Sequence, residues 1–137
     1  MVKVDKIIET ALYCNDLNLS VNFYKELFGF EAMAENERLC AFDVNGKSIL
    51  ILFCRKESIK PIVTEGGVIP AHFGNGQLHI AFSISKEEVG RWGEKLLAFG
   101  VRIVSQVQWP LGGTSLYFYD PDQNLVELAT PGLWKSY

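Results

Sequence analysis

The sequence predicts an α+β fold built from two β-α-β-β-β repeats. A strand-like run, a helical run and three further strand-like runs follow one another within residues 5–54. The same order returns within residues 77–130, and Leu27-Phe28-Gly29-Phe30 recurs as Ala98-Phe99-Gly100-Val101. We therefore interpret residues 1–137 as a single domain made by internal duplication, with residues 55–76 as the loop that joins the repeats.

The first repeat opens with a β-like run at residues 6–14, followed by Asn15-Asp16, which is a helix-start signal. The next run carries apolar residues on one helical face and stops at Gly29. That face consists of Leu19, Phe23, Tyr24 and Leu27. Strands are predicted at 31–34, 39–44 and 48–54, and Asn45-Gly46 indicates a tight hairpin between the last two.

The second repeat begins with a strand at residues 77–84, after which Ser85 and Glu88 have the spacing of a capping box. The following helix is expected to place Val89, Trp92, Leu96 and Leu97 inward and to end at Gly100. Strands are predicted at 101–107, 114–119 and 125–129. The turn-forming residues 120–124 separate the last two of these strands.

Charge and cysteine content narrow the class of protein. A formal net charge of −3, with no Lys/Arg cluster, argues against nucleic acid and anionic membranes as partners. Three cysteines, an odd number in apolar strand-like contexts, predict reduced core thiols. Neither a signal peptide nor an apolar run of membrane-spanning length is evident, so a cytoplasmic protein without a membrane partner is expected.

Strand alternation sorts the side chains into two faces of each predicted sheet. One face is apolar and suited to packing under a helix. The other combines small residues with Glu9, His79, Ser115, Tyr117, Tyr119 and Glu127. Because charged groups are costly to bury unless they are paired or bind a metal, we interpret this second face as the wall of a cavity.

Two segments resemble the vicinal-oxygen-chelate superfamily, which contains glyoxalases, bleomycin-resistance proteins and extradiol dioxygenases. They are Asn15-Asp16 with the run FYKELFGF at 23–30, and the run YFYDPDQNLVEL at 117–128. The resemblance covers nearly the whole chain. It implies two βαβββ units that form a curved mixed sheet, as half-barrels with helices on the outer face.

The resemblance also implies a divalent metal bound by residues on the first and last strands of the repeats. The matching positions here are Glu9, His79 and Glu127, whereas the fourth position falls at the apolar Ile51. The usual set of three is His, His and Glu, so Glu9 departs from it. An oxygen-rich set favours Mn²⁺, Mg²⁺ or Fe²⁺ and leaves Zn²⁺ and Ni²⁺ open.

Roles beyond metal binding are predicted as well. Glu127 or Glu9 would be the catalytic base that removes a proton next to a carbonyl. Candidate substrate-binding residues are Phe53, Arg55, Trp109, Ser115, Tyr117 and Tyr119. Arg55, which follows the cavity-side series 49, 51, 53, would be an anion anchor or a solvated rim residue, and His72 is expected to be exposed.

Two functions remain open at this point. The first is a glyoxalase-like metal-dependent enzyme acting on a small oxygenated substrate, as a lyase or isomerase and less favourably as a dioxygenase or thiol transferase. The second is a non-enzymatic module that binds a small molecule or antibiotic. The resemblance also implies a homodimer, with residues 55–76 or 131–137 contributing contacts.

Overall fold

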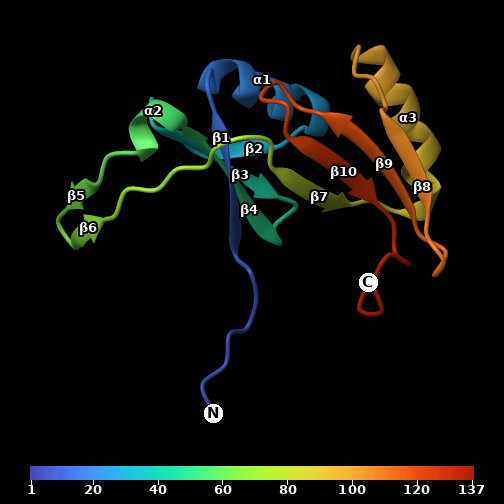
Figure 1. The fold of residues 1–137 in the computed structure, drawn as a ribbon, viewed down its shortest axis with the longest axis horizontal. Coiled ribbons are helices and arrows are strands. Elements are labelled where there is room, and N and C mark those ends of the chain that lie inside the picture. The colour runs from blue at the N-terminus through green and yellow to red at the C-terminus, as the bar shows by residue number, and fades with distance from the viewer. The chain divides into compact units, whose positions relative to one another are not determined.

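The computed structural model describes residues 1–137, and the chain divides into two compact units, Met1–Gly76 and Gln77–Tyr137. Each unit contains one four-stranded sheet and one main helix (Figure 1). No helix in either unit is long and apolar enough to cross a membrane. The two units are described in turn below.

The sheet of the first unit has the strand order β1-β4-β3-β2. Its elements are β1 (Glu9–Cys14), α1 (Leu17–Phe28), β2 (Glu31–Glu35), β3 (Leu39–Val44) and β4 (Ser48–Cys54). β1 runs parallel to β4, and the other neighbouring strands are antiparallel. β3 and β4 have the predicted bounds, and Asn45 and Gly46 between them both have positive φ, as a tight hairpin turn requires.

Helix α1 starts and stops where local chemistry predicts. The Asp16 side chain accepts a hydrogen bond from the Leu19 amide at 3.1 Å, and Gly29 ends the helix in the left-handed conformation. Val21, Tyr24 and Leu27 are buried against the sheet. Leu19 was expected on this face but is 56% exposed, because the buried stripe runs through Ser20, Val21, Tyr24 and Leu27, and Leu19 lies to one side of it.

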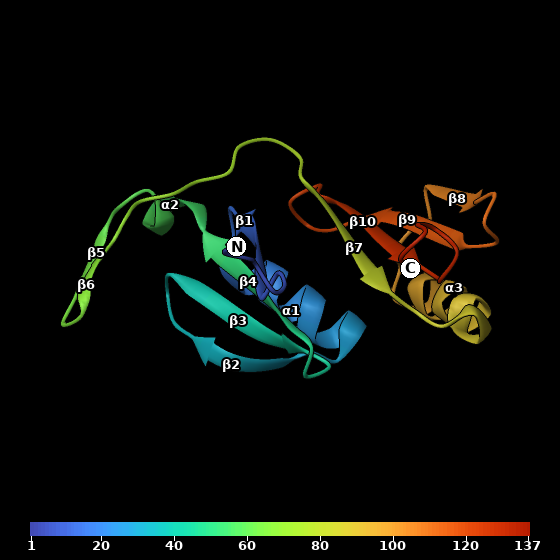
Figure 2. The same cartoon turned by 90° about the horizontal axis from the view of Figure 1, so that it is seen from below.

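The segment expected as a loop between the repeats contains regular structure. A short helix, α2 (Arg55–Ser58), follows β4 directly. β5 (Ile62–Thr64) and β6 (Gly67–Ile69) then form a two-stranded hairpin that extends away from the sheet of the first unit (Figures 1 and 2). Each of these elements is too short to give a clear periodic signal in the sequence.

The sheet of the second unit has the strand order β7-β10-β9-β8, which repeats the topology of the first. Its elements are β7 (His79–Ser83), the 3-10 turn η1 (Lys86–Glu88), α3 (Val89–Ala98), β8 (Ser105–Gln108), β9 (Thr114–Tyr119) and β10 (Leu125–Ala129). β7 runs parallel to β10, as β1 does to β4. The predicted α+β fold of two βαβββ modules is therefore confirmed.

Two local predictions for α3 were wrong. The Ser85 side chain makes no capping hydrogen bond, because a 3-10 turn separates it from the start of α3. Leu96 is fully buried, whereas Leu97 is 80% exposed. One residue is about 100° of helical rotation, so a helix with a single buried stripe cannot place both neighbours in the core.

In each unit, the helix covers one face of the sheet, and we call the opposite face the open face. The helix-covered side of the first sheet buries Leu12, Cys40, Phe42, Leu50 and Leu52, and that of the second buries Leu116, Phe118, Val126 and Leu128. The three cysteines form no disulfide. Alternation then places Glu9 on the open face of the first sheet, and His79 and Glu127 on that of the second.

Candidate metal centre

His79 lies at the start of β7, and its ring orientation is fixed by a backbone contact. Its Nδ1 is 2.9 Å from the carbonyl oxygen of Leu125 on the parallel neighbour β10. A carbonyl oxygen only accepts hydrogen bonds, so Nδ1 carries the proton. In the neutral ring, Nε2 is then left with a free lone pair, which is the state in which histidine binds metals.

Glu127 lies on β10, and its carboxylate is held between two neighbours. Its side chain is only 6% exposed. Oε2 accepts a hydrogen bond of 2.6 Å from the Ser115 hydroxyl, and Oε1 is 3.2 Å from Nε2 of His79. A neutral imidazole and a carboxylate would therefore direct two lone pairs at each other, which is repulsive. A positive charge between or on them removes the repulsion, and it can be either a proton on His79 or a metal ion.

The Glu127 carboxylate is the end of a longer chain of donors. Trp109 Nε1 donates to the Ser115 hydroxyl at 2.8 Å, and this hydroxyl, which is fully buried, donates to Glu127. The indole has no acceptor, so the direction of both hydrogen bonds is fixed. The chain from Trp109 to Glu127 thus orients one carboxylate oxygen and leaves the other facing His79.

Tyr117, on β9, lies next to the His79–Glu127 pair. Its ring stacks on that of His79 with centroids 6.4 Å apart. Burial, and next the negative charge of Glu127, raise the pKa of the Tyr117 phenol above its ordinary value, so the hydroxyl keeps its proton at neutral pH. Tyr119 lies on the same strand face but is 40% exposed.

The strand registers identify which residues of the two units are counterparts. Glu9 pairs with Ile49 across β1 and β4, and His79 pairs with Leu125 across β7 and β10. Two residues on, Ala11 pairs with Ile51, and Ala81 pairs with Glu127. Glu9 is therefore the counterpart of His79, and Ile51 is the counterpart of Glu127.

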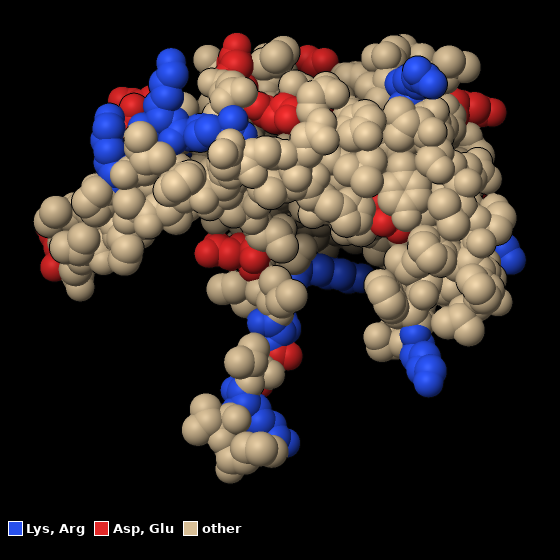
Figure 3. All heavy atoms as spheres, viewed as in Figure 1, with Lys and Arg blue, Asp and Glu red and all other residues tan.

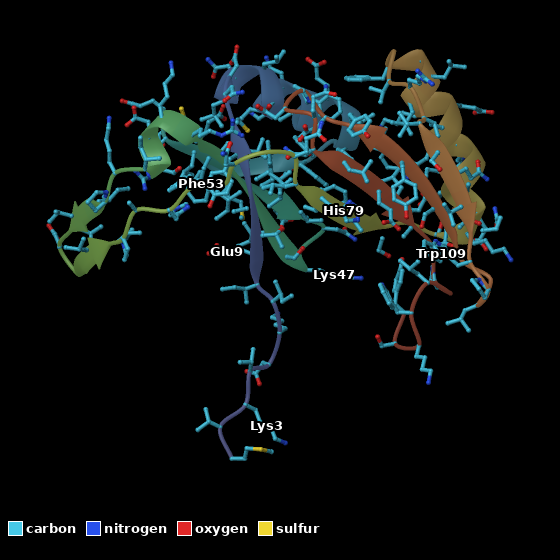
Figure 4. All side chains as sticks on the ribbon, viewed as in Figure 1. Lys3, Glu9, Lys47, Phe53, His79 and Trp109 are labelled. Carbon is cyan, nitrogen blue, oxygen red and sulfur yellow. The ribbon has the colours of Figure 1, made fainter.

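The Glu9 side chain is exposed and forms no ion pair or hydrogen bond within the first unit, where Figure 4 labels it on β1. Neither unit by itself gathers three His, Cys, Asp or Glu side chains around one point. The second unit, in contrast, places one nitrogen and one oxygen that could bind a metal 3.2 Å apart. These ligand types fit the divalent ions of the transition series as well as Mn²⁺.

Phe53, another predicted site residue of the first unit, belongs to an aromatic cluster that the sequence did not reveal. Phe53 lies edge-on to His72 with ring centroids 4.5 Å apart, and Tyr13 donates its hydroxyl proton to, or accepts one from, His72 Nδ1 at 2.8 Å. His72 was expected to be exposed and is instead half-buried. No sequence signal pairs it with Tyr13, because the two are 59 positions apart.

Arg55, the predicted anion anchor, begins α2 and is half-buried. Its Nη1 donates to the side-chain oxygen of Asn15 at 2.8 Å. Its Nε is buried and has no hydrogen-bond partner. The Arg55 guanidinium is therefore hydrogen-bonded through Nη1, whereas its Nε donor has no acceptor.

Comparison with known proteins agrees with this architecture. The family model for the Glyoxalase/Bleomycin resistance protein/Dioxygenase superfamily matches residues 6–128. The metallothiol transferase FosB of Bacillus licheniformis is 32% identical over 117 residues, which cover 85% of this chain and 69% of the relative. The fosfomycin resistance protein FosX of Listeria monocytogenes is 30% identical over 119 residues, covering 86% of this chain and 84% of the relative.

A solved structure extends the likeness to the fold of almost the full chain. The crystal structure of lactoylglutathione lyase from Agrobacterium tumefaciens superposes with a TM-score of 0.87 at 34% sequence identity, covering 96% of this chain and 98% of that one. The family model spans most of the chain, and the strand topology is the one that the resemblance implied. This protein belongs to the glyoxalase/bleomycin resistance protein/dioxygenase superfamily.

Proposed function

We propose that this protein is a metal-dependent, glyoxalase-like enzyme that acts on a small oxygenated substrate. The observation that carries the proposal is the His79–Glu127 pair, in which Nε2 of His79 faces Oε1 of Glu127 at 3.2 Å. Ser115 fixes the carboxylate and the Leu125 carbonyl fixes the imidazole. Outer contacts of this kind are typical of metal-binding histidines and carboxylates.

Glu9 is the proposed third ligand. It stands in the first unit where His79 stands in the second, on the first strand of the repeat. Three ligands leave positions open for a substrate, and a bound divalent ion would supply Lewis-acid polarisation of two neighbouring substrate oxygens. Mn²⁺, Mg²⁺, Fe²⁺, Zn²⁺ and Ni²⁺ are all compatible with one nitrogen and two carboxylates.

The two carboxylates are suited to different tasks. Both oxygens of Glu127 are engaged, by Ser115 and His79, so Glu127 is suited to hold a fixed position. Glu9 has no partner in its unit and can accept or return a proton. We therefore favour Glu9 as the base that removes a proton next to a carbonyl, with Glu127 as the positioned ligand. Phe53, Arg55, Trp109, Ser115, Tyr117 and Tyr119 remain the proposed substrate-side residues.

The test is metal analysis of the full chain purified without chelator, followed by turnover of lactoylglutathione, and of fosfomycin with a thiol. We expect one metal ion per chain. Glu127→Gln should weaken metal binding about 100-fold or more, since a ligand is worth at least as much as its supporting contacts. Glu9→Gln should lower turnover by about 10²–10⁴-fold, the usual contribution of a general base.

Glu31→Gln is the matched control, because Glu31 is an exposed strand carboxylate of the first unit. It should change neither metal content nor turnover. Full turnover in Glu9→Gln would show that Glu9 is not the catalytic base. Absence of stoichiometric metal in the unmodified chain would instead favour a non-enzymatic module that binds a small molecule or antibiotic, an alternative that the apolar Ile51 supports.

A homodimer is part of the proposal. The β5–β6 hairpin exposes Val63 by 81% and Val68 by 60%, and such apolar side chains are typical of a subunit contact. The C-terminal tail is a weaker candidate, because the Tyr137 hydroxyl is already bonded to Ser83 and to the Ala129 carbonyl of its own unit. A single-chain mass in light scattering would argue against the dimer.

A further inference from the structure

The surroundings of α2 hold the polar atoms that the chain leaves unsatisfied. Three buried side-chain atoms have no hydrogen-bond partner, namely Arg55 Nε, Arg38 Nη2 and Ser58 Oγ. Arg55 and Ser58 are the first and last residues of α2, and Arg38 Nη1 donates to the Glu57 carbonyl at 2.6 Å. Buried polar groups are nearly always paired in folded proteins, so three exceptions around one helical turn need an explanation.

A pocket of about 580 Å³ opens beside α2, entirely within the first unit. Its polar lining combines two cationic side chains with two amides, and its apolar lining comes from the end of α2 and the segment before Gly76. These residues are Asn15, Arg55, Lys56 and Asn75, with Ile59 and Phe73. No carboxylate lines the pocket. Its volume suits a small organic molecule.

The orientation of Arg55 defines what the polar end of the pocket recognises. Asn15 holds Nη1, which leaves the edge formed by Nε and Nη2. Two parallel N–H donors along one edge of a guanidinium match the two oxygens of a carboxylate or phosphoryl group. Arg55 lines the pocket, and an oxyanion bound along this edge would supply the acceptor that Nε lacks.

The electrostatic environment also favours a negative ligand. Lys56 adds a second positive charge, and Figure 3 shows Lys and Arg atoms gathered over α2. The nearby Glu57 carboxylate is already 3.7 Å from the Lys60 ammonium. The chain as a whole is acidic, with a formal charge of −3, so this positive site is a local feature and not a consequence of overall charge.

The remaining lining points to an apolar body attached to the anion. Ile59 is 52% and Phe73 67% exposed, and both would lose contact with water if a hydrocarbon group lay against them. Gly74 also lines the pocket and packs so closely on Tyr13 that an added Cβ would lie only 2.4 Å from the Tyr13 ring. Tyr13 follows Glu9 by four residues on the open face of β1, about 13 Å along an extended strand.

We infer that this pocket binds the carboxylate or phosphoryl group of a small organic anion with an apolar body, through Arg55 and Lys56. If the bound anion is the substrate, the inference rests on the proposed function. The charged end of the substrate would then lie at one end of β1, and Glu9 lies at the other end. Binding of the anion itself needs neither a metal nor turnover.

The test is calorimetric titration of the full chain with benzoate, phenylphosphonate, inorganic phosphate and the neutral amide benzamide. We expect benzoate or phenylphosphonate to bind about tenfold more tightly than benzamide, the effect of one charge-assisted pair. The stronger of the two identifies the charged group as carboxylate or phosphoryl. Inorganic phosphate should bind more weakly than phenylphosphonate, and equal affinity would overturn the assignment of an organic ligand.

Two variants and two controls complete the experiment. Arg55→Gln should weaken anion binding about tenfold, and Lys56→Gln, at an exposed position, by less. Lys47→Gln removes the same charge at the other end of β4 and should leave affinity unchanged. Glu127→Gln should also leave it unchanged, so loss of the metal site and loss of the anion site are distinguishable. Wild-type anion affinity in both Arg55→Gln and Lys56→Gln would overturn the inference.

Discussion

The open faces of the two sheets share a backbone plan and differ in chemistry. In the second unit, the open face carries Ser115, Tyr117 and Glu127, and the residues at the same register in the first are Leu39, Ala41 and Ile51. The second unit therefore holds a hydrogen-bonded network that the first unit lacks. The comparison teaches that the fold constrains one side of each sheet and leaves the other free to diverge.

The helix-covered faces, in contrast, are closely matched. Phe42 pairs with Leu50 in the first unit, and Phe118 pairs with Val126 at the same register in the second. All four are buried, with the two phenyl rings fully so. Dense packing under a helix tolerates few changes in volume, which explains why the repeats stay alike on this side.

The largest effect is expected at these matched phenylalanines. Phe42→Ala and Phe118→Ala should each lower the free energy of unfolding by about 3–5 kcal/mol, the cost of a large cavity. Urea unfolding with hydrogen exchange would show which unit is affected. Leu97→Ala is the control, since this side chain is 80% exposed and should cost little. A much smaller cost at one phenylalanine than at the other would contradict the equivalence of the cores.

A smaller effect is expected at the polar network of the second unit. Ser115→Ala removes the donor to Glu127 Oε2 and should weaken binding of Mn²⁺ by about 10–100-fold, as for other supporting contacts of metal ligands. Calorimetric titration measures this affinity. Ser105→Ala, on the exposed strand β8, is the matched control. Unchanged affinity in Ser115→Ala would mean that the network does not position Glu127.

The smallest effect concerns a core thiol present only in the first unit, where Cys40 stands at the position of Leu116. Burial, and next the charge of Glu35, raise the pKa of Cys40 from 9.0 to about 11. Since the folded state favours the protonated thiol, its contribution to stability is full below pH 9.0 and is lost as the pH rises through about 11.

The measurement compares urea unfolding at pH 8 and pH 11 in the unmodified chain and in Cys40→Ala, because tyrosines and lysines also titrate in this range. The unmodified chain should lose more stability between the two pH values than the variant does. Parallel pH dependences in the two proteins would show that the thiol does not contribute.

Local sequence patterns determined most of the backbone. Period-two alternation gave the bounds of β3, β4, β9 and β10, and the Asn-Gly pair gave the hairpin between the first two. Asp16 and Gly29 located the ends of α1. The same patterns missed α2 and the β5–β6 hairpin, and they placed Leu97 in the core, because short elements and neighbouring apolar residues carry little periodic information.

The sequence by itself thus determined the order of the main strands and helices in each repeat, the two faces of each sheet, the family and the residues proposed for the candidate metal centre. Tertiary structure decided the partners: that the Leu125 carbonyl orients His79, that Ser115 and Trp109 hold Glu127, and that Arg55 keeps an unsatisfied donor beside a pocket. Alternation and capping depend on neighbours in the chain, whereas hydrogen-bond partners depend on which distant strands and loops pack together.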